Sequence, residues 1–304
     1  MIDILKGLAS GRWAFFVAWV LPGAIAVAAF AFVIFPAIDH LPVLADVASL
    51  QPVEKSLVLA FSPLVLGVVL NASSTPLYRL LEGYTWPKPI RDWGTGRQKS
   101  RKRKLEQLVK DQSGVEQELA YEKLHRYPAD DEQICATRLG NALRAFETYG
   151  KDRFGLDSQT FWTELNAVVP GSLRDDLEDA RASVDFFVNL LFQSGGFAAI
   201  ALAVGLLGEE RRAILLTSAV LAVLLGWMWY LLAVSSCSYW SDTVQALVHL
   251  GRTRLASALG LRLPDTLEEE RAMWLQASRL VFYPAGHERE GDVDRFRSVP
   301  TEST

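Results

Sequence analysis

Four long apolar runs are the feature that most constrains how this chain of 304 residues can fold. A hydrocarbon core needs about 20 apolar residues in a helix to cross it, because each residue advances a helix by about 1.5 Å. Three runs reach this length, and the second reaches it if its helix continues to about Pro76. The sequence therefore predicts an all-α polytopic membrane protein with four transmembrane helices. The runs are Trp13–Pro36, Ser56–Ala72, Val184–Leu207 and Ala213–Val234, and the predicted spans cover about 13–36, 56–76, 184–207 and 213–236.

Lysine and arginine are distributed unevenly between the segments that join these runs. Residues 37–54 contain neither, whereas residues 78–183 contain eighteen. The turn 208–212 contains two, offset by two glutamates, and the stretch after residue 235 contains eight. Positive residues stay on the cytosolic side because their transfer through the bilayer is unfavourable. We therefore expect a multi-pass protein of the cell inner (plasma) membrane whose N- and C-termini are both cytosolic.

The long segment between the second and third runs predicts a separate domain, because about 100 residues suffice for a small hydrophobic core. We expect an N-terminal transmembrane hairpin over 1–81 and an inserted cytosolic helical domain over 82–182. A C-terminal transmembrane hairpin with a cytosolic extension should cover 183–248, and further cytosolic helices 249–284. Residues 285–304 are polar and lack aliphatic periodicity, so we expect a disordered tail.

The pair Pro22-Gly23 lies in the middle of the first run. Proline removes one backbone hydrogen bond of a helix and clashes with the preceding turn. We expect a kink at this point. A gating hinge is the alternative interpretation.

A polar stripe interrupts the third run. Asp185, Asn189 and Gln193 are spaced four residues apart, so they share one face of a helix. Polar side chains at membrane depth are costly unless they are paired or hydrated. Two interpretations stay open. The stripe either holds helices together by hydrogen bonds, which we favour, or lines an ion path.

Two ridges of small residues lie on the third and fourth runs. Such ridges let membrane helices approach closely. Packing within one chain explains them, and contacts between copies in a homo-oligomer are the alternative. The ridges are Gly195, Ala199 and Ala203 on the third run, and Ser218, Ala222 and Gly226 on the fourth.

A basic cluster follows the second run. Positive side chains just inside a membrane attract anionic lipid headgroups and help to fix the topology. Nucleic-acid binding is disfavoured, because no aromatic platform is interleaved with the charges and no known motif is present. The cluster consists of Arg97, Lys99, Arg101, Lys102, Arg103 and Lys104.

The most distinctive stretch covers residues 137–162. It contains Thr137-Arg-Leu-Gly-Asn141, then Glu147 and Arg153-Phe-Gly-Leu-Asp157. It resembles a segment of uncharacterised bacterial four-span membrane proteins, and this resemblance implies no activity. Physically, the pattern of the stretch favours residues that form the core of a domain. A ligand or partner pocket is the alternative. The residues that would form such a pocket, or an ion-pair network, are Arg138, Asn141, Glu147 and Arg153.

No pattern in the sequence indicates catalysis. The four histidines are not spaced as metal ligands, and no phosphate-binding loop, nucleophile elbow or zinc-protease motif is present. We therefore expect no enzyme activity, no catalytic residue, and no metal or other cofactor. The leading hypothesis is a membrane protein whose cytosolic helical domain senses or docks an unknown cytosolic partner. The alternative is an oligomeric ion channel or pore-forming effector that this domain gates.

Overall fold

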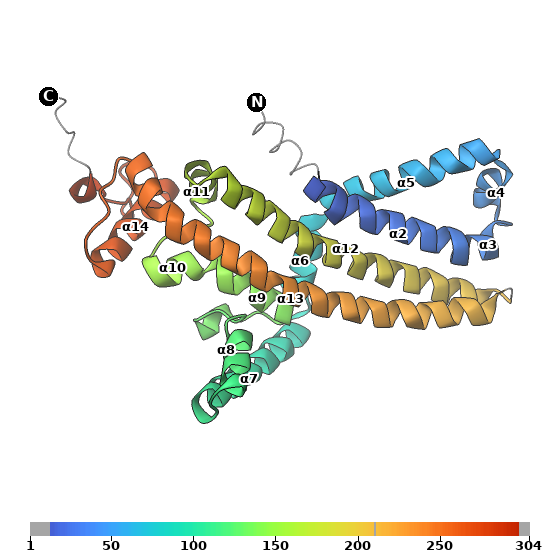
Figure 1. Ribbon diagram of the computed structural model, residues 1–304, viewed down its shortest axis with the longest axis horizontal. Coiled ribbons are helices and arrows are strands. Elements are labelled where there is room, and N and C mark those ends of the chain that lie inside the picture. The colour runs from blue at the N-terminus through green and yellow to red at the C-terminus, as the bar shows by residue number, and fades with distance from the viewer. Residues whose placement is uncertain (1–12, 210, 298–304) are drawn as a thin grey trace. The chain divides into compact units, whose positions relative to one another are not determined.

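The computed structural model describes residues 13–209 and 211–297 of the chain. The first twelve residues of the predicted N-terminal hairpin and residues 298–304 of the predicted tail lie outside these ranges. Within them the structure is helical, with one isolated bridge between Leu261 and Arg297 and no β-strand (Figure 1). The chain divides into two compact units. Unit 1 comprises residues 1–79 and 178–237, and unit 2 comprises residues 80–177 and 238–304.

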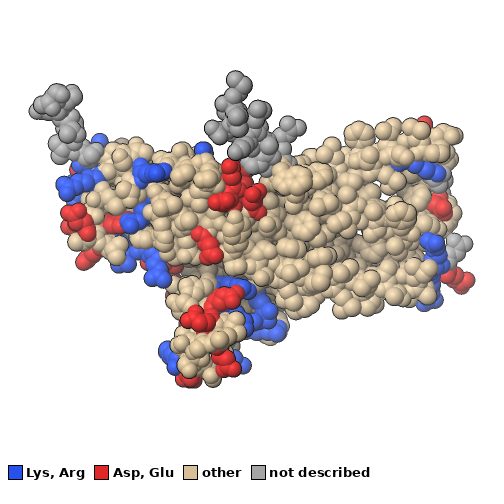
Figure 2. All heavy atoms as spheres, viewed as in Figure 1, with Lys and Arg blue, Asp and Glu red and all other residues tan. Residues whose placement is uncertain are grey.

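Four helices are long and apolar enough to cross a membrane, as the sequence predicts. The second begins at Pro52 and ends at Ala72, so its predicted continuation to about Pro76 is wrong, and its length comes from the N-terminal end. In Figure 2 the visible face of unit 1 is almost free of charged side chains along these helices. Charged side chains gather at the end that carries α4 and the turn between the last two spans. A charge-free band between polar ends is what a bilayer requires. The four helices cover Trp13–Ile38, Pro52–Ala72 (α5), Gly171–Leu207 (α12) and Arg212–Ala258 (α13).

Prolines shape the first span. Each of its two π-helical turns ends two residues before a proline, Pro22 or Pro36. A proline has no N–H and its ring crowds the carbonyl four residues earlier, so a wider turn relieves the helix at this point. The predicted kink therefore takes the form of a widened turn. The segments of this span are η1 (Phe16–Val20), α2 (Leu21–Ala29), η2 (Phe30–Ile34) and α3 (Phe35–Ile38).

The first two spans pack through glycines. A Cβ atom on Gly23 would lie 2.9 Å from the carbonyl oxygen of Pro63, and one on Gly67 would lie 3.1 Å from that of Trp19. The distance at Gly23 leaves no room for a side chain, and the distance at Gly67 is shorter than an ordinary van der Waals contact, so the two backbones pack closely at both points. Membrane helices associate by this kind of close packing, because lipid tails offer no hydrophobic driving force between helices.

The two predicted ridges of small residues differ in their surroundings. On α13, Ala222 and Gly226 are buried, and a Cβ atom on Gly226 would lie 3.7 Å from Leu191 and Ser194 of α12. On α12, Gly195 and its two ridge partners are exposed. The α13 ridge thus packs within unit 1, and the role of the α12 ridge between copies of the chain stays a prediction.

Short helices connect the spans. Helix α4 (Pro42–Ser49) precedes α5, and α6 (Ser74–Glu82) follows it. The start of α5 is fixed by a capping box, in which the Gln51 backbone N–H donates to Glu54 Oε2 at 2.8 Å. This bond satisfies a backbone donor that the helix itself leaves unpaired.

Unit 2 has a hydrophobic core of its own, centred on Trp274, which is fully buried. Leu165, Leu247 and Met273 are also fully buried in this cluster. Besides the outer parts of α12 and α13, unit 2 contains α7 (Lys88–Asp111), α8 (Val115–Leu124), η3 (Asp131–Gln133), α9 (Arg138–Glu147), α10 (Tyr149–Phe154), α11 (Trp162–Val168), α14 (Leu267–Phe282) and η4 (Asp294–Phe296).

The last described residues differ from the predicted disordered tail. Val293 and Phe296 are buried in the core of unit 2, and the Arg262 N–H donates to the Phe296 carbonyl at 2.7 Å. Two apolar side chains without helical or strand periodicity were enough to anchor the segment. The prediction of disorder is therefore wrong for residues 285–297.

Substitution of the packing glycines should destabilise unit 1. We expect Gly23→Ala and Gly67→Ala each to cost about 1–3 kcal/mol, because an overpacked contact must shift backbone atoms. Gly195→Ala is the matched control: nothing lies within 4 Å of its Cβ position, so helix propensity should make it neutral or stabilising by up to about 1 kcal/mol. Thermal unfolding of the purified protein in detergent measures the three effects. Equal melting temperatures for Gly23→Ala and Gly195→Ala would contradict the packing.

Candidate functional site

The middle residue of the polar stripe bonds to the first span. Asn189 is 0% exposed, and its Nδ2 donates to the carbonyl oxygen of Ala18 at 2.6 Å. Ala18 lies four residues before Pro22, so Pro22 supplies no helical N–H to this carbonyl. An unpaired carbonyl at membrane depth is costly. Asn189 therefore gives this carbonyl a donor from another span.

The first residue of the stripe is paired as well. Asp185 is 4% exposed, and its Oδ1 accepts a hydrogen bond from Tyr78 Oη at 2.5 Å. Its Oδ2 lies 3.5 Å from Arg181 Nε, one turn earlier on α12. A buried carboxylate is tolerated when it has such a donor and a cation. The contact joins α6 to α12 within unit 1.

Gln193, the third residue of the stripe, is different. Its Oε1 and Nε2 atoms are both buried, and neither has a hydrogen-bond partner among the described residues. The side chain lines a cavity of about 770 Å³ in unit 1. The stripe thus has two members engaged in contacts within the chain and one member, Gln193, whose amide makes no hydrogen bond at either atom. The Oδ1 atom of Asn189 is also buried without a partner among the described residues.

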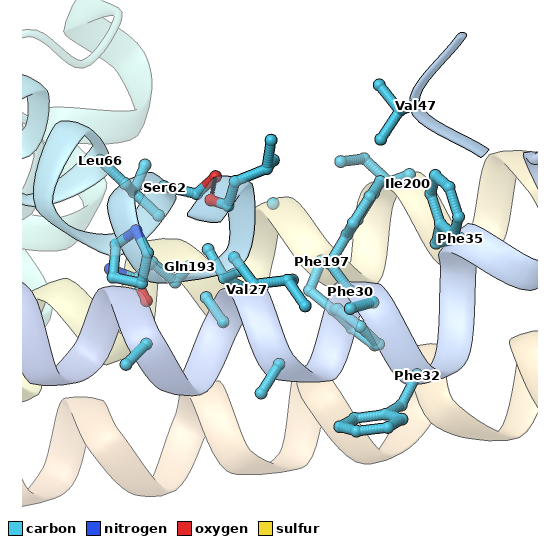
Figure 3. A pocket seen from close by; sticks show the side chains of 18 of the residues that line it. Val27, Phe30, Phe32, Phe35, Val47, Ser62, Leu66, Gln193, Phe197 and Ile200 are labelled. Carbon is cyan, nitrogen blue, oxygen red and sulfur yellow. Dashed lines mark hydrogen bonds between the residues drawn. The ribbon is translucent and has the colours of Figure 1, made fainter. Parts of the chain in front are cut away.

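The cavity is almost wholly apolar, and we call it the apolar cavity. Figure 3 shows Gln193 at the end where Ser62 and Leu66 lie, with Phe35 and Val47 toward the other end. It is a partly open cavity lined by the first span, α4, α5 and α12. Its apolar lining includes Val27, Phe30, Leu59, Leu66, Phe197 and Ile200.

All six residues of the predicted basic cluster lie on α7, and the structure separates one of them from the rest. Lys102 is 6% exposed, and its Nζ donates to the Ala129 carbonyl at 2.9 Å and to Asp131 Oδ1 at 2.7 Å. It shares a buried face of α7 with Gln98 and Leu105. The assignment of Lys102 to a lipid-facing surface is therefore wrong. Of the others, Arg97, Arg103 and Lys104 are exposed, and Lys99 and Arg101 are half-buried.

The contact with Lys102 has an electrostatic consequence. The ammonium group donates a hydrogen bond to Asp131 and thereby lowers the pKa of that carboxyl below its ordinary value. The ion pair fixes the loop before η3 to α7. Lys102 is thus a structural residue of unit 2.

Asn141 holds the loop that precedes α9. It is fully buried, and its Oδ1 accepts from the Cys135 backbone N–H at 2.9 Å. Its Nδ2 donates to the carbonyls of Cys135 and Thr137 at 3.0 and 2.6 Å. The side chain of Thr137 in turn caps α9 by accepting from the Gly140 N–H at 2.9 Å. These bonds favour the domain-core interpretation of this stretch.

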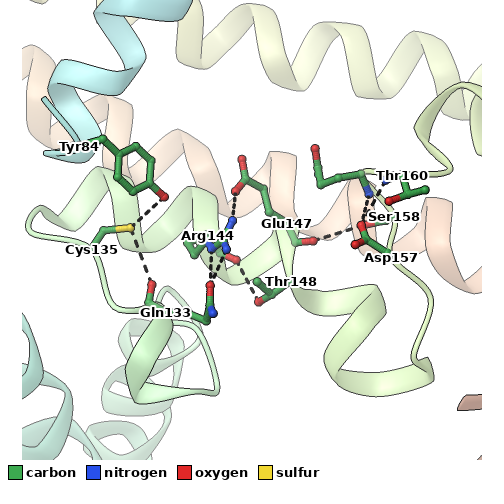
Figure 4. A network of polar contacts seen from close by, with 10 residues as sticks. Tyr84, Gln133, Cys135, Arg144, Glu147, Thr148, Asp157, Ser158 and Thr160 are labelled. Atoms are coloured by element: carbon green, nitrogen blue, oxygen red, sulfur yellow. Dashed lines mark hydrogen bonds and ion pairs between the residues drawn. The ribbon is translucent and has the colours of Figure 1, made fainter. Parts of the chain in front are cut away.

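The structure gives Glu147 a cation that the sequence did not single out. Arg144 Nη1 lies 3.4 Å from Glu147 Oε2, and Arg144 Nε also donates to Gln133 Oε1 at 2.9 Å (Figure 4). Helical spacing places Arg144 three residues before Glu147, which is an ordinary distance for an ion pair. Glu147 therefore forms an ion pair with Arg144, a residue that the predicted network did not include.

Unit 2 contains a second cavity, which we call the polar pocket, of about 570 Å³. Arg153, a predicted site residue, lines it. Lys102 of the predicted basic cluster lines it too. Sequence reasoning missed the other members, because they come from segments that are distant in the chain. They include His125, Tyr127, Tyr149, Asp152 and Gln245.

The cysteines offer little reactivity. Cys135 and Cys237 are both buried, and neither forms a disulfide among the described residues. Burial raises the pKa of the Cys135 thiol, which keeps it in the unreactive protonated form. Among the described residues no group of three His, Cys, Asp or Glu side chains is placed to hold a metal ion.

Comparisons of the chain with protein families, with curated proteins and with solved structures found no match. The function must therefore be argued from the two units themselves.

The hydrogen bond of Asn189 should make this residue more important for the stability of unit 1 than Gln193, the next residue of the stripe. We expect Asn189→Leu to destabilise unit 1 by about 1 kcal/mol, because the Ala18 carbonyl loses its donor. Gln193→Leu should be neutral or stabilising, because its amide has no partner to lose. Thermal unfolding in detergent checks both. If Gln193→Leu were the more damaging change, the assignment of Asn189 as the bridging residue would fail.

Loss of Lys102 should destabilise unit 2 more than loss of its exposed neighbour Arg103. We expect Lys102→Met to cost about 1–2 kcal/mol, because a buried charge-assisted hydrogen bond is lost, and Arg103→Met to cost little. Hydrogen exchange of the α7 and α8 amides in the full chain measures the difference.

The effect should also depend on pH. A carboxyl whose folded-state pKa is lowered stabilises the fold above its unfolded pKa, about 3.9 for Asp. That contribution is lost as the pH falls through the lower folded-state value. The gap between the Lys102→Met and Arg103→Met variants should therefore be full at pH 7 and shrink below about pH 4. A gap that stays constant down to pH 2 would show that Asp131 is not the partner that matters.

Proposed function

We propose that this chain is a non-enzymatic membrane protein whose unit 2 docks or senses a cytosolic partner, while the four spans anchor it. The observation that carries the proposal is the polar pocket. It belongs to a unit with its own buried core, and α13, which continues from the fourth span, contributes Ser241 and Gln245 to its lining. Pockets of this size with a few convergent polar groups are typical binding sites.

The proposed orientation of the chain in the membrane follows from the distribution of positive charge. Unit 2 contains most of the lysine and arginine that joins the spans, whereas residues 37–54 contain none. The positive-inside rule then places unit 2 and both termini in the cytosol. In this orientation the exposed basic residues of α7 lie where anionic headgroups would attract them.

The chemistry of the pocket favours a polypeptide as the partner. Arg153 and His125 contribute positive or titratable groups, Glu106 and Asp152 contribute carboxylates, and Tyr149 contributes an aromatic ring. Tyr149 Oη lies 2.8 Å from His249 Nε2, which fixes the ring. A surface of both charges with a fixed aromatic side chain suits a peptide segment of mixed charge better than a strongly anionic ligand.

The channel alternative receives less support. A conducting stripe would need polar groups that face water, yet Asp185 and Asn189 are occupied by contacts within unit 1. Their hydrogen bonds are those expected of helix packing.

The proposal can be tested with matched variants of the full chain in nanodiscs. Arg153→Glu reverses a charge that lines the pocket, whereas Lys151→Glu reverses an exposed charge two residues away that does not. We expect a cytosolic protein captured by the wild type to be lost from the Arg153→Glu protein and retained by the Lys151→Glu protein. Affinity capture with quantitative mass spectrometry measures this.

Capture of the same proteins by both variants would remove the pocket from the proposal. Ion flux through vesicles that contain the wild type, abolished by Asn189→Leu, would instead favour the channel.

A further inference from the structure

We propose that the apolar cavity of unit 1 binds one long hydrocarbon chain that carries a neutral hydroxyl or carbonyl group, with this group hydrogen-bonded to Gln193. The ligand class is a neutral membrane lipophile. The inference concerns a site other than the polar pocket and stands whether or not unit 2 docks a partner.

The lining and length of the cavity suit the hydrocarbon of a bilayer. The cavity lies among three of the four spans, so hydrocarbon rather than water surrounds it. From Lys55 to Leu66 it follows α5 for about 16 Å, at about 1.5 Å per residue. That is about half the thickness of a hydrocarbon core. A volume of about 770 Å³ is within the range of ligand pockets, and an apolar lining selects an apolar chain.

A second feature of the cavity is the unpaired amide of Gln193. Its donor and acceptor atoms are both buried without a partner among the described residues. A buried polar group is costly when it makes no hydrogen bond. A ligand with a neutral hydrogen-bonding group supplies what the amide lacks.

The backbone of α5 along the cavity offers a further acceptor. Pro63 has no N–H, so the Leu59 carbonyl four residues earlier lacks its helical donor. Leu59 and Pro63 both line the cavity. A hydroxyl can donate to a carbonyl oxygen and accept from an amide N–H, so one group can serve both.

The placement of charge indicates a neutral head group. The one charged side chain among the lining residues is Lys55, about 12 Å along α5 from Pro63 at about 1.5 Å per residue. Figure 3 shows Gln193 at the Ser62 and Leu66 end. A charged head would thus be placed among apolar side chains, whereas a neutral one is tolerated. The hydrocarbon chain then extends toward Phe35 and Val47.

Photolabelling of the full chain in phosphatidylcholine nanodiscs tests the site. One probe is hexadecanol with a diazirine in its chain and a terminal alkyne, and the second is the same chain without the hydroxyl group. Labelled peptides are identified by mass spectrometry. We expect the alcohol to label the cavity segments 24–35, 58–66 and 193–200 about threefold or more above the hydrocarbon, the ratio expected for one hydrogen bond.

Two neighbouring glycines provide a blocking variant and its control. Nothing lies within 4 Å of the Cβ position of Gly195 or Gly196, but only Gly196 is among the residues that line the cavity. Gly196→Leu should fill the cavity and reduce labelling by both probes, whereas Gly195→Leu should leave it unchanged. Gln193→Leu should reduce labelling by the alcohol to the level of the hydrocarbon probe.

The proposal is overturned if Gly196→Leu and Gly195→Leu are labelled alike, or if the two probes label the wild type equally. Competition on the wild type covers the case in which a variant does not fold. An excess of unlabelled hexadecanol should suppress labelling at the cavity segments and not at the exposed face of α13. Suppression that is equal at both places would show only nonspecific partition into the bilayer.

Discussion

The constraint on which unit 1 depends is that every backbone carbonyl at membrane depth needs a hydrogen-bond donor. Proline breaks this rule wherever it enters a span, and the first span contains Pro22. The chain answers with Asn189, whose Nδ2 reaches the Ala18 carbonyl that Pro22 cannot serve. Because the donor comes from α12, a local defect of the first span becomes a link between two spans that lie far apart in the sequence.

The same rule applies to α5 beside the apolar cavity. Pro63 withholds an N–H from the Leu59 carbonyl, just as Pro22 does from that of Ala18. The nearby Gln193 could have served here as Asn189 serves there, yet its amide makes no hydrogen bond among the described residues. One proline is therefore compensated by a buried asparagine in a closed contact. The other stands beside an unpaired amide in a cavity of about 770 Å³.

The sequence predicted what depends on average hydropathy and missed what depends on particular partners. The four spans follow from apolar runs, and the shared face of Asp185 and Asn189 follows from helical spacing. The burial of Lys102 was hidden because its neighbours in sequence are all basic, although Gln98 and Leu105 lie on the same face. The ordered segment before residue 297 was missed because Val293 and Phe296 are too few to form a period. The polar pocket joins elements too distant in the chain for any local pattern to connect them.

The two units are stabilised by different physics, and this explains which positions matter in each. In the proposed orientation water surrounds unit 2, so large apolar side chains such as Trp274 contribute by leaving water, and their truncation leaves cavities. In unit 1 lipid tails are as apolar as the side chains, so burial contributes little between helices. Stability there rests on close backbone contact at Gly23 and Gly67, where added atoms rather than lost ones do the damage. A cavity among the spans is therefore tolerated because hydrocarbon can fill it, whereas the same void in the core of unit 2 would remain a defect.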